Sequence, residues 1–416
     1  MVDWTCSKDC NLGMMLIGGH GLKIEALRIK NFKTLKDITI NNLPNFCVFV
    51  GTNGSGKTTL FNVFAFLKDA FSDNIHIALT KQGGSKGFQE VRSRGSEGPI
   101  EIELKFRENS TSPLITYFLS INEKEGRPVI EKEILQYRRG SKGKPWRFLD
   151  FSYGKGEAVV NEPDEATEEK ELIREQHTLK SVDILALKGL AQFEKFPASK
   201  ALGELLENWH VSDFRIQQAR QDREAGSAEH LSREGENLSW VTDFLYKHHR
   251  AAFDAIIDKL KKRVPGLSSV DAKTTEEGRV LLRFTDKAFI DPFLARNVSD
   301  GTIKMFAYLV LLYDPKPHPL LCVEEPENQL YPKLLAELAE EFRSYAQNGG
   351  QVFVSTHSPD FLNACELEEV FWLSKKNGYS TISRASEDDQ LFAYVQEGDK
   401  LGYLWRQGFF TGADPE

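Results

Sequence analysis

The sequence predicts an α/β protein whose core, a mixed sheet with helices, is divided by a long insertion. Three observations predict this fold. A glycine-rich loop joins an apolar strand to a helix near residue 50, strands and helices alternate again after residue 278, and the pattern between them is different. With 416 residues, the chain has room for about two to three domains, or for one large domain that carries an insertion.

The first part of the core is predicted over residues 22–80. Residues 22–30 alternate apolar and polar side chains, as a strand with one buried face does, and a second short strand is expected at 38–40. The run 46–50 is apolar throughout, which is typical of a buried parallel strand. Apolar residues then recur at helical spacing from Thr58, so a strand, a glycine loop and a helix follow one another directly.

The insertion is predicted to begin as an antiparallel β lobe over 81–160 and to continue as a helical arm over 161–277. Alternating runs predict the strands of the lobe at 100–106, 114–121, 129–135 and 146–151. Acidic residues dominate from Glu162 to Glu175, as in an exposed connector, and the pattern beyond is mainly helical.

The second part of the core is predicted over 278–416. Strands and helices alternate there: a strand from Arg279, a helix over 301–313, a strand over 320–323, a helix over 333–346 and a strand over 352–355. This alternation predicts a parallel sheet covered by helices.

The segment from Gly51 to Thr58 has the pattern G-x-x-x-x-G-K-[ST] between a strand and a helix. In such a loop the backbone N–H groups surround phosphates, the lysine reaches the β and γ phosphates, and the hydroxyl binds Mg²⁺. The alternative is a glycine-rich turn without a ligand. The nucleotide-binding residues predicted here are Asn53, Gly54, Ser55, Gly56, Lys57, Thr58 and Thr59, with Thr58 also as a metal ligand.

Carboxylates follow the apolar strand 320–323 in the order Glu324, Glu325, Pro326, Glu327. The carboxyl ends of parallel strands are where ligands bind in α/β sheets. One acid there can hold a hydrated metal ion, and the next can polarise a water molecule for attack on a phosphate. An exposed acidic turn is the alternative.

Together these residues resemble the ABC-class ATPases of the RecF/SMC-like kind, and within them the bacterial AAA-type ATP-binding proteins with an EEPEN motif. Four features match in order along the chain: Gly51 to Thr58, Val298 to Thr302, Glu324 to Asn328, and Ser355 to Pro359.

The resemblance implies a composite ATP site, in which Ser299 and Gly301 of one subunit cap the γ-phosphate held by Lys57 and Thr58 of another. ATP and Mg²⁺ are the implied ligands, and self-association as a homodimer or a larger oligomer follows. The implied roles beyond the phosphate loop are Glu325 as general base, Glu324 as metal-supporting carboxylate and His357 as the switch histidine that hydrogen-bonds the γ-phosphate.

The sequence departs from the family pattern at three positions. Glu324 stands where most ABC proteins have aspartate, Asp300 where transporters have glycine, and Tyr331 where transporters have an acidic residue. A carboxylate at position 300 would weaken the closed state or require a basic neighbour such as Lys304. For the glutamine that senses Mg²⁺, spacing leaves both Gln89 and Gln82 open; Gln89 is preferred here, and an ordinary polar loop residue is the alternative.

Two groups of basic residues are candidate contacts for duplex DNA, and ordinary surface residues are the alternative for both. Arg138, Arg139, Lys142, Lys144 and Arg147 lie near Tyr137 and Trp146 on a predicted hairpin, which is either a phosphate-backbone contact or a solvated tip. Lys259, Lys261, Lys262 and Arg263 at a helix end are most simply complements of the helix dipole. The net charge of −8 excludes neither DNA nor a protein partner.

The sequence shows no sign of a membrane span, a coiled-coil arm or a nuclease domain, and this favours a separate effector. There is no apolar run of about 20 residues, so no membrane contact is expected, and five scattered cysteines suit a reducing, cytoplasmic location. No long heptad array is present, and the roughly 60 residues after His357 are too few for a nuclease domain.

We therefore expect an ATPase that controls a separate effector protein, such as a nuclease or toxin, in bacterial defence. A RecF-like clamp on duplex DNA is the alternative. A non-hydrolysing structural module is the third reading, and Lys57, Thr58 and Glu325 count against it.

Overall fold

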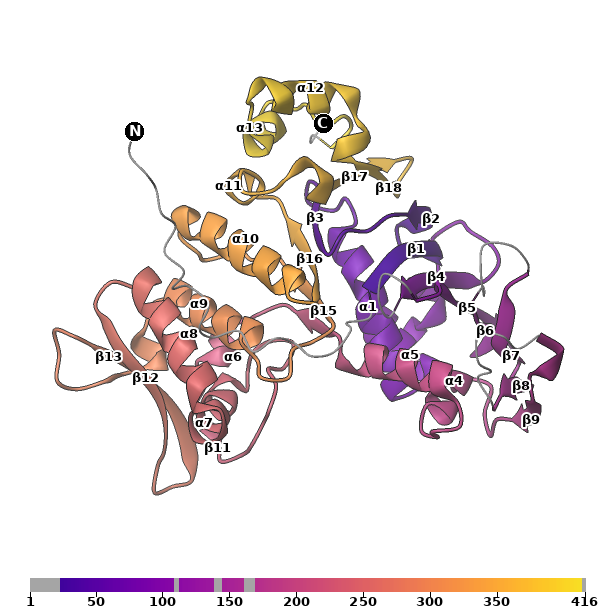
Figure 1. The fold of residues 1–416 in the computed structure, drawn as a ribbon, viewed down its shortest axis with the longest axis horizontal. Helices are drawn as coiled ribbons and strands as arrows, with labels where there is room; N and C mark the ends of the chain where they lie inside the picture. Colours follow the sequence, from indigo (N-terminus) through magenta and orange to yellow (C-terminus); the bar gives the residue numbers. More distant parts are fainter. Residues whose placement is uncertain (1–22, 108–111, 138–143, 161–168, 414–416) are drawn as a thin grey trace. The chain divides into compact units, whose positions relative to one another are not determined.

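The computed structural model describes residues 23–107, 112–137, 144–160 and 169–413. They divide into two compact units, which we treat separately (Figure 1). The larger unit contains the described residues of Gly21–Val211, His318–Pro326 and Gly350–Glu416. The smaller unit contains Ser212–Pro317 and Glu327–Gly349.

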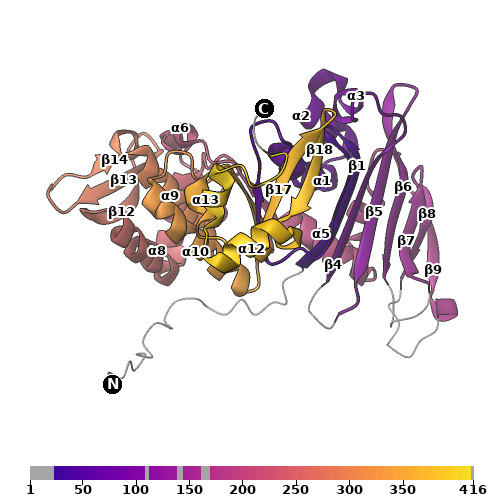
Figure 2. The same cartoon turned by 90° about the horizontal axis from the view of Figure 1, so that it is seen from above.

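An eight-stranded antiparallel sheet forms one part of the larger unit, in the order β2-β1-β4-β5-β6-β7-β8-β9 (Figure 2). Its strands are β1 (Lys23–Phe32), β2 (Leu35–Ile40), β4 (Ile100–Arg107), β5 (Ile115–Lys124), β6 (Arg127–Tyr137), β7 (Trp146–Ser152), β8 (Lys155–Val159) and β9 (Arg174–Thr178). Every second residue of β4 is buried, as the sequence alternation requires of a sheet with one covered face.

The four strands predicted for the β lobe are confirmed as β4 to β7, but they do not form a sheet of their own. Leu27 of β1 lies opposite Leu104 of β4, so the strands predicted for the first part of the core continue the lobe's sheet. Alternation along a strand shows which face is buried and leaves its pairing partner open.

A second sheet of the larger unit has the order β10-β15-β16-β3-β17-β18. Its strands are β3 (Phe46–Val50), β10 (His210–Ser212), β15 (Leu320–Glu324), β16 (Gln351–Thr356), β17 (Val370–Lys376) and β18 (Tyr379–Arg384). Strands β15, β16, β3 and β17 run parallel to one another, and β18 pairs antiparallel with β17. The predicted mixed sheet is therefore confirmed.

Helix α1 (Lys57–Ser72) packs on this second sheet through aromatic contacts. The ring of Phe61 lies 6.1 Å from Phe49 of β3, and the ring of Phe64 lies 5.6 Å from Phe353 of β16. The other helices of the unit are α2 (Ile75–Gly83), α3 (Phe88–Val91), α4 (Ala186–Leu190), α5 (Pro197–Asn208), α11 (Pro359–Leu362), α12 (Asp389–Glu397) and α13 (Leu401–Arg406). None of the helices within the described ranges is both long enough and apolar enough to cross a membrane.

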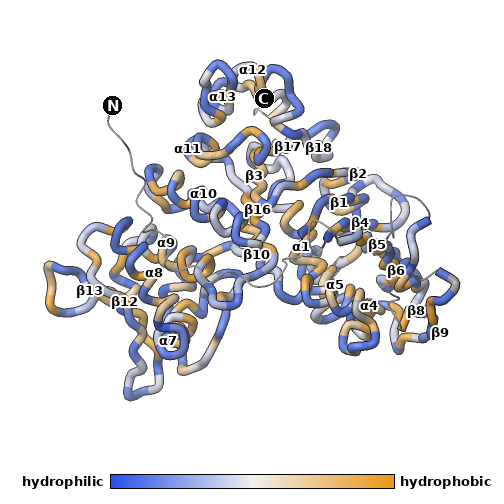
Figure 3. The backbone as a smooth tube through the Cα atoms, in the orientation of Figure 1, coloured by the Kyte–Doolittle hydropathy of each residue, from blue (hydrophilic) through white to orange (hydrophobic). Residues whose placement is uncertain are grey.

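The smaller unit combines a small antiparallel sheet with helices. The strands are β11 (Arg223–Glu224), β12 (Leu267–Thr274), β13 (Arg279–Asp286) and β14 (Phe293–Leu294), and the helices are α6 (Ile216–Ala219), α7 (Leu238–His248), α8 (Arg250–Arg263), α9 (Asp300–Leu312) and α10 (Pro332–Gln347). Hydrophobic and hydrophilic residues alternate along α10, as Figure 3 shows, and most of the residues that the helix buries are apolar.

One expectation for this region was wrong. The strand from Arg279 is not part of the parallel sheet, because β13 pairs antiparallel with β12 across a turn at Gly278, whose φ is 75°. Its alternating burial fits a sheet with one covered face rather than a buried parallel strand. The region beyond residue 171 also contains the short strands β9, β10 and β11 between its helices.

Candidate functional site

The phosphate loop connects β3 to α1, and its glycines are required by its geometry. Gly54 and Gly56 have φ values of 78° and 112°, which side chains other than glycine rarely adopt. A Cβ atom on Gly51 would lie 2.8 Å from the carbonyl oxygen of Leu373. The backbone can therefore close around a ligand without a side chain in the way.

Lys57 begins α1 and is held inside this loop. Its side chain is 5% exposed, and Nζ donates to the carbonyl oxygens of Gly51 at 2.6 Å and Thr52 at 3.2 Å. A buried ammonium group is stable only where oxygen atoms surround it. The loop thus fixes a positive charge beside its own backbone amides.

The rest of the loop fits a polyphosphate. Asn53, Gly54 and Thr58 are exposed and Thr59 is half-buried, so the loop is open to solvent. The hydroxyl of Ser55 is buried and has no hydrogen-bond partner among the described residues. A buried hydroxyl without a partner is costly, and an anionic ligand bound in the loop would accept its hydrogen bond.

Three neighbouring parallel strands end at the same edge, at which the phosphate loop begins. Val50 of β3 lies opposite Thr356 of β16, and Ser355 lies opposite Glu324 of β15. The next residues are therefore Gly51, His357 and Glu325. Strand register alone brings the predicted phosphate loop, the predicted base and the predicted switch histidine to one edge.

Glu325 and His357 lie close together at this edge. Oε1 of Glu325 is 3.6 Å from Nδ1 of His357, and both side chains are partly exposed. The N–H of Glu325 donates to the carbonyl oxygen of Ser355 at 2.9 Å, with φ at 42°. This backbone conformation is unfavourable for glutamate, and such outliers cluster at functional sites.

Glu324 and Thr58 are the two oxygen donors predicted for Mg²⁺. Glu324 is the last residue of β15 and is 9% exposed, while Thr58 lies in the first turn of α1. Carboxylate and hydroxyl oxygens are ligands that Mg²⁺ accepts. These residue types suit the ion.

The two candidate glutamines have other partners. Gln89 lies in α3, and its Nε2 donates to Glu123 of β5 at 3.5 Å. Gln82 lies in α2 and accepts a hydrogen bond from Lys33 at 3.2 Å. Within the described part of the chain, neither glutamine has a hydrogen bond to the phosphate loop.

In the smaller unit, the predicted residues Ser299 and Gly301 are at the start of α9. Ser299 is the N-cap, and its Oγ accepts from the N–H of Thr302 at 3.3 Å. A Cβ atom on Gly301 would lie 2.9 Å from the carbonyl oxygen of Gln329, so close packing requires glycine here. Both residues therefore have a structural role within their own unit.

Asp300 has a basic partner, but it is not Lys304. Arg220 forms an ion pair with Asp300 and donates to the carbonyl oxygen of Val298. Lys304 is buried over the ring of Tyr308 instead. A helix places residues i and i+4 on one face, but the arginine that follows α6 reaches Asp300 from another part of the unit.

Two residues at the phosphate loop were missed by the sequence analysis. Ser380 of β18 has its Oγ 2.7 Å from the carbonyl oxygen of Ser55 and 2.9 Å from Oγ1 of Thr34. A Cβ atom on Gly56 would lie 2.2 Å from the same Oγ. Serine and threonine are common everywhere, so no signal in one sequence could have connected residues this far apart.

The predicted basic hairpin is only partly described, because Arg138, Arg139 and Lys142 lie outside the described residues. Tyr137 ends β6 directly before Arg138, but its side chain is not exposed beside the loop. It is 8% exposed and stacks on Phe148 with the ring centroids 4.2 Å apart. Tyr137 therefore belongs to the core of the eight-stranded sheet, and so is not available to a nucleic acid base.

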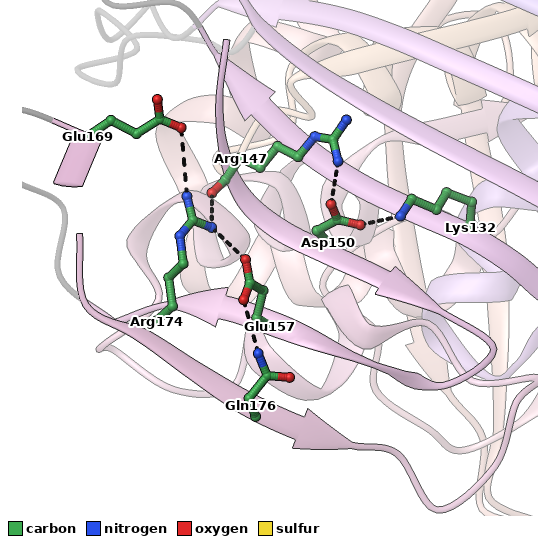
Figure 4. Close-up of polar contacts among 7 residues, drawn as sticks. All are labelled: Lys132, Arg147, Asp150, Glu157, Glu169, Arg174 and Gln176. Atoms are coloured by element: carbon green, nitrogen blue, oxygen red, sulfur yellow. Dashed lines mark hydrogen bonds and ion pairs between the residues drawn. The ribbon is translucent and has the colours of Figure 1, made fainter. Parts of the chain in front are cut away.

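Three cations beside this hairpin, Lys132, Arg147 and Arg174, are paired with carboxylates (Figure 4). Asp150 binds both Lys132 and Arg147, and Arg174 binds Glu157 at 3.1 Å. Partial burial acts to raise the pKa of Asp150, but the hydrogen bonds from the two cations outweigh it and lower the pKa. Among the residues drawn in Figure 4, each of these three cations is therefore balanced by a carboxylate.

The basic residues at the end of α8 are also engaged. Lys259 and Arg263 bind Oε1 of Glu341 on α10 at 2.8 Å and 2.7 Å. Arg263 is 9% exposed. These two cations hold helices together within the smaller unit, in addition to any interaction with the helix dipole.

One protein family matches the chain, over residues 46–363, with the description "AAA domain, putative AbiEii toxin, Type IV TA system". A crystal structure of an SMC head bound to the C-terminal winged-helix domain of ScpA is similar, with a TM-score of 0.53 and 14% identity over 86% of this chain and 96% of that chain. An SMC head with an extended coiled coil, bound to the C-terminal domain of ScpA derived from Pyrococcus furiosus, is also similar. Its TM-score is 0.49 and its sequence identity is 12%, over 90% of this chain and 100% of that chain.

The SMC head of Thermotoga maritima gives a TM-score of 0.44 and 15% identity over 87% of this chain and 98% of that chain. No curated protein sequence matches. The family match covers more than half of the chain, and the SMC-head similarity agrees with the phosphate loop and the mixed sheet described above. The chain therefore belongs to this AAA-domain family and has a P-loop fold of the ABC/SMC-like kind.

Proposed function

We propose that this protein binds and hydrolyses ATP, and that ATP-dependent association of its copies controls a separate effector in bacterial anti-phage defence. The observation that carries the hydrolytic part is the distance of 3.6 Å between Glu325 and His357 at the sheet edge where the phosphate loop begins. A base and a hydrogen-bond donor beside a phosphate loop are what in-line phosphoryl transfer to water needs.

Each residue of the edge has a role in this proposal. The loop amides and Lys57 bind the phosphates, and Thr58 with Glu324 would hold Mg²⁺, which when bound neutralises charge on the phosphate oxygens. Glu325 orients the attacking water and accepts its proton, and His357 hydrogen-bonds the γ-phosphate. Gln89 would have to leave Glu123 to sense the metal ion.

Association of two copies is proposed because Ser299 and Gly301 are at the N-terminus of the 13-residue helix α9. The positive end of a helix attracts anions, so α9 of one copy can cap the γ-phosphate bound by another. ATP would then hold a homodimer, or a larger oligomer built from dimers, together until hydrolysis.

The effector is proposed to be a separate protein, such as a nuclease or toxin, in the cytoplasm. Two findings support a protein partner. The matched SMC head is bound to a domain of another protein, and the family description names a toxin of a toxin–antitoxin system.

The test is Lys57→Ala, measured for ATP affinity and for release of phosphate. We expect both to be lost, because the phosphates lose their fixed charge, while Lys124→Ala at the exposed end of β5 serves as the matched control. Unchanged ATP affinity in Lys57→Ala would refute the assignment of the loop.

A RecF-like clamp on duplex DNA is the second candidate, and the SMC-head fold is its support. The paired cations beside β7 do not favour it. Duplex binding by Glu325→Gln, with and without ATP, at low and physiological salt separates the two, since phosphate contacts weaken steeply as salt rises. ATP-dependent binding that survives physiological salt would favour the clamp; its absence, in protein that assembles on ATP, favours a protein effector.

A further inference from the structure

The hairpin formed by β17 and β18 has two faces, and the strand register assigns residues to each. Lys375 lies directly opposite Ser380 in this hairpin. Side chains of directly opposed residues share one face, and their neighbours along each strand point to the other. On that other face, the hydroxyl groups of Ser374 and Thr381 are 2.6 Å apart.

The face with Lys375 and Ser380 is the one that meets the phosphate loop. Ser380 is 4% exposed, and its Oγ is within hydrogen-bond distance of both the Ser55 carbonyl and the Thr34 hydroxyl. A hydroxyl has one hydrogen to donate, and a carbonyl can only accept. Ser380 therefore donates its hydrogen to the Ser55 carbonyl or to the Thr34 hydroxyl, and these contacts fix the middle of the loop to the hairpin.

Lys375 brings a positive charge to the same loop. Its Nζ lies 3.9 Å from the position that a Cβ atom of Gly54 would occupy. The side chain is exposed, and among the described residues it has neither an ion pair nor a hydrogen bond. Gly54 is itself an exposed residue of the loop, so the ammonium group is free to approach an anion bound there.

We propose that this hairpin is a second part of the nucleotide site, in which Lys375 binds the polyphosphate of ATP and Ser380 positions the phosphate loop. The proposal rests on the proposed binding of ATP. Lys57 already supplies one charge from inside the loop, and a triphosphate carries several. A second, flexible ammonium group from the hairpin adds attraction that grows with the number of phosphates.

The role of Lys375 is tested by calorimetric binding of ATP, ADP and AMP to the full chain carrying Glu325→Gln. We expect Lys375→Met to weaken ATP about tenfold, ADP less and AMP hardly at all, since a charge-assisted hydrogen bond to phosphate is lost. Lys375→Arg should retain most of the affinity. Lys376→Met is the matched control, because the next lysine along β17 points to the opposite face.

Equal ATP affinity in Lys375→Met and Lys376→Met would overturn the role of Lys375. Because Lys375 is exposed, its variants test the proposal without threatening the fold. If the unsubstituted chain fails to bind ATP, the proposed function fails; if it binds and Lys57→Ala abolishes binding while the hairpin variants bind normally, only this inference fails.

The role of Ser380 is tested by Ser380→Ala against Ser374→Ala, which removes a hydroxyl from the other face of the same hairpin. We expect Ser380→Ala to raise KM for ATP several-fold with kcat little changed, because the loop loses its binding geometry. A merely structural role would reduce the active fraction and hence kcat, without a change in KM. An unchanged KM would overturn the positioning role.

Discussion

Oε1 of Glu325 lies 3.6 Å from Nδ1 of His357, across the ends of two neighbouring parallel strands. The backbone conformation of Glu325 is strained, since its φ is 42° and such a conformation costs about 1–3 kcal/mol of folding free energy. The N–H of Glu325 compensates in part by donating to Ser355. This backbone directs a carboxylate and an imidazole to the same place, where one can orient water and the other can contact a phosphate.

Glu325→Gln is expected to lower ATP turnover at least about a hundredfold, because general-base catalysis contributes that much or more. ATP affinity should persist, and the ATP-bound assembly should accumulate. Phosphate release and light scattering with ATP measure the two effects, with exposed Glu368→Gln as the control. Turnover within a few-fold of the unsubstituted chain would move the role of base to another carboxylate, with Glu327 next to test.

Arg220→Ala is expected to weaken ATP-dependent assembly of Glu325→Gln at least about tenfold. The variant leaves Asp300 without its partner beside the segment proposed to meet a γ-phosphate, and frees the carbonyl of Val298. Light scattering over a range of protein concentrations measures the effect.

The combination Arg220→Ala with Asp300→Ala should restore much of this assembly, because the uncompensated negative charge is then gone. Arg283→Ala, which breaks the 2.7 Å ion pair with Asp271 in the same unit, is the matched control. A double variant as defective as Arg220→Ala alone would show that Arg220 does not act by neutralising Asp300.

Strong local patterns were sufficient to predict three strands of the second sheet, β3, β15 and β16, but not β10, β17 or β18. The apolar run 46–50 and the glycine loop correspond to β3 and the start of α1, and the predicted helix 301–313 is α9 at 300–312. These elements are set by hydrophobic periodicity, which one sequence contains. The strand from Arg279 was placed in the wrong sheet, because periodicity does not identify a pairing partner.

The same limit applies to the site. The phosphate-loop pattern indicated Lys57, the family resemblance implied the roles of Glu325 and His357, and strand register then brought their segments to one edge. The sequence could not indicate Arg220 or Ser380, because only the tertiary fold brings these residues to their partners. Contacts between residues far apart in the chain depend on packing, for which a single sequence has no local signal.

Stability of the larger unit is expected to fall as pH rises from about 4.5 to 7, through Glu133. This carboxyl of β6 is 1% exposed and accepts hydrogen bonds from the N–H groups of Ala186 and Leu187 and from Tyr117. Burial raises its pKa from 4.5 to about 7 and outweighs those hydrogen bonds.

The direction follows from proton binding. Between pH 4.5 and 7 the folded state keeps a proton that the unfolded state has lost, so rising pH favours unfolding, by about 3 kcal/mol in total for such a shift. Glu133→Gln should remove this dependence, and Glu131→Gln on the same strand should retain it. Urea denaturation at several pH values measures it, and the same slope in Glu133→Gln would contradict the assignment.

Glu341 is expected to give the smaller unit the opposite dependence on pH. It accepts hydrogen bonds from Lys259, Arg263 and Tyr313 at 2.7–2.8 Å. Partial burial acts to raise its pKa, but the hydrogen bonds from Lys259 and Tyr313, with the charges of Lys259 and Arg263, outweigh it and lower the pKa. A lowered carboxyl pKa stabilises the fold above about pH 4.5, and that stabilisation is lost as pH falls through the folded value.

Glu341→Gln should therefore destabilise the smaller unit by about 3 kcal/mol at neutral pH, since Lys259 and Arg263 lose their shared carboxylate and Arg263 keeps only its ion pair with Glu337. The difference from the unsubstituted chain should shrink below pH 4.5, where the carboxylate becomes protonated. Hydrogen exchange of peptides from α8 and α10 reports on this unit, with the exposed neighbour Glu340→Gln as control. Equal exchange rates in the two variants would mean that the Glu341 network does not hold these helices together.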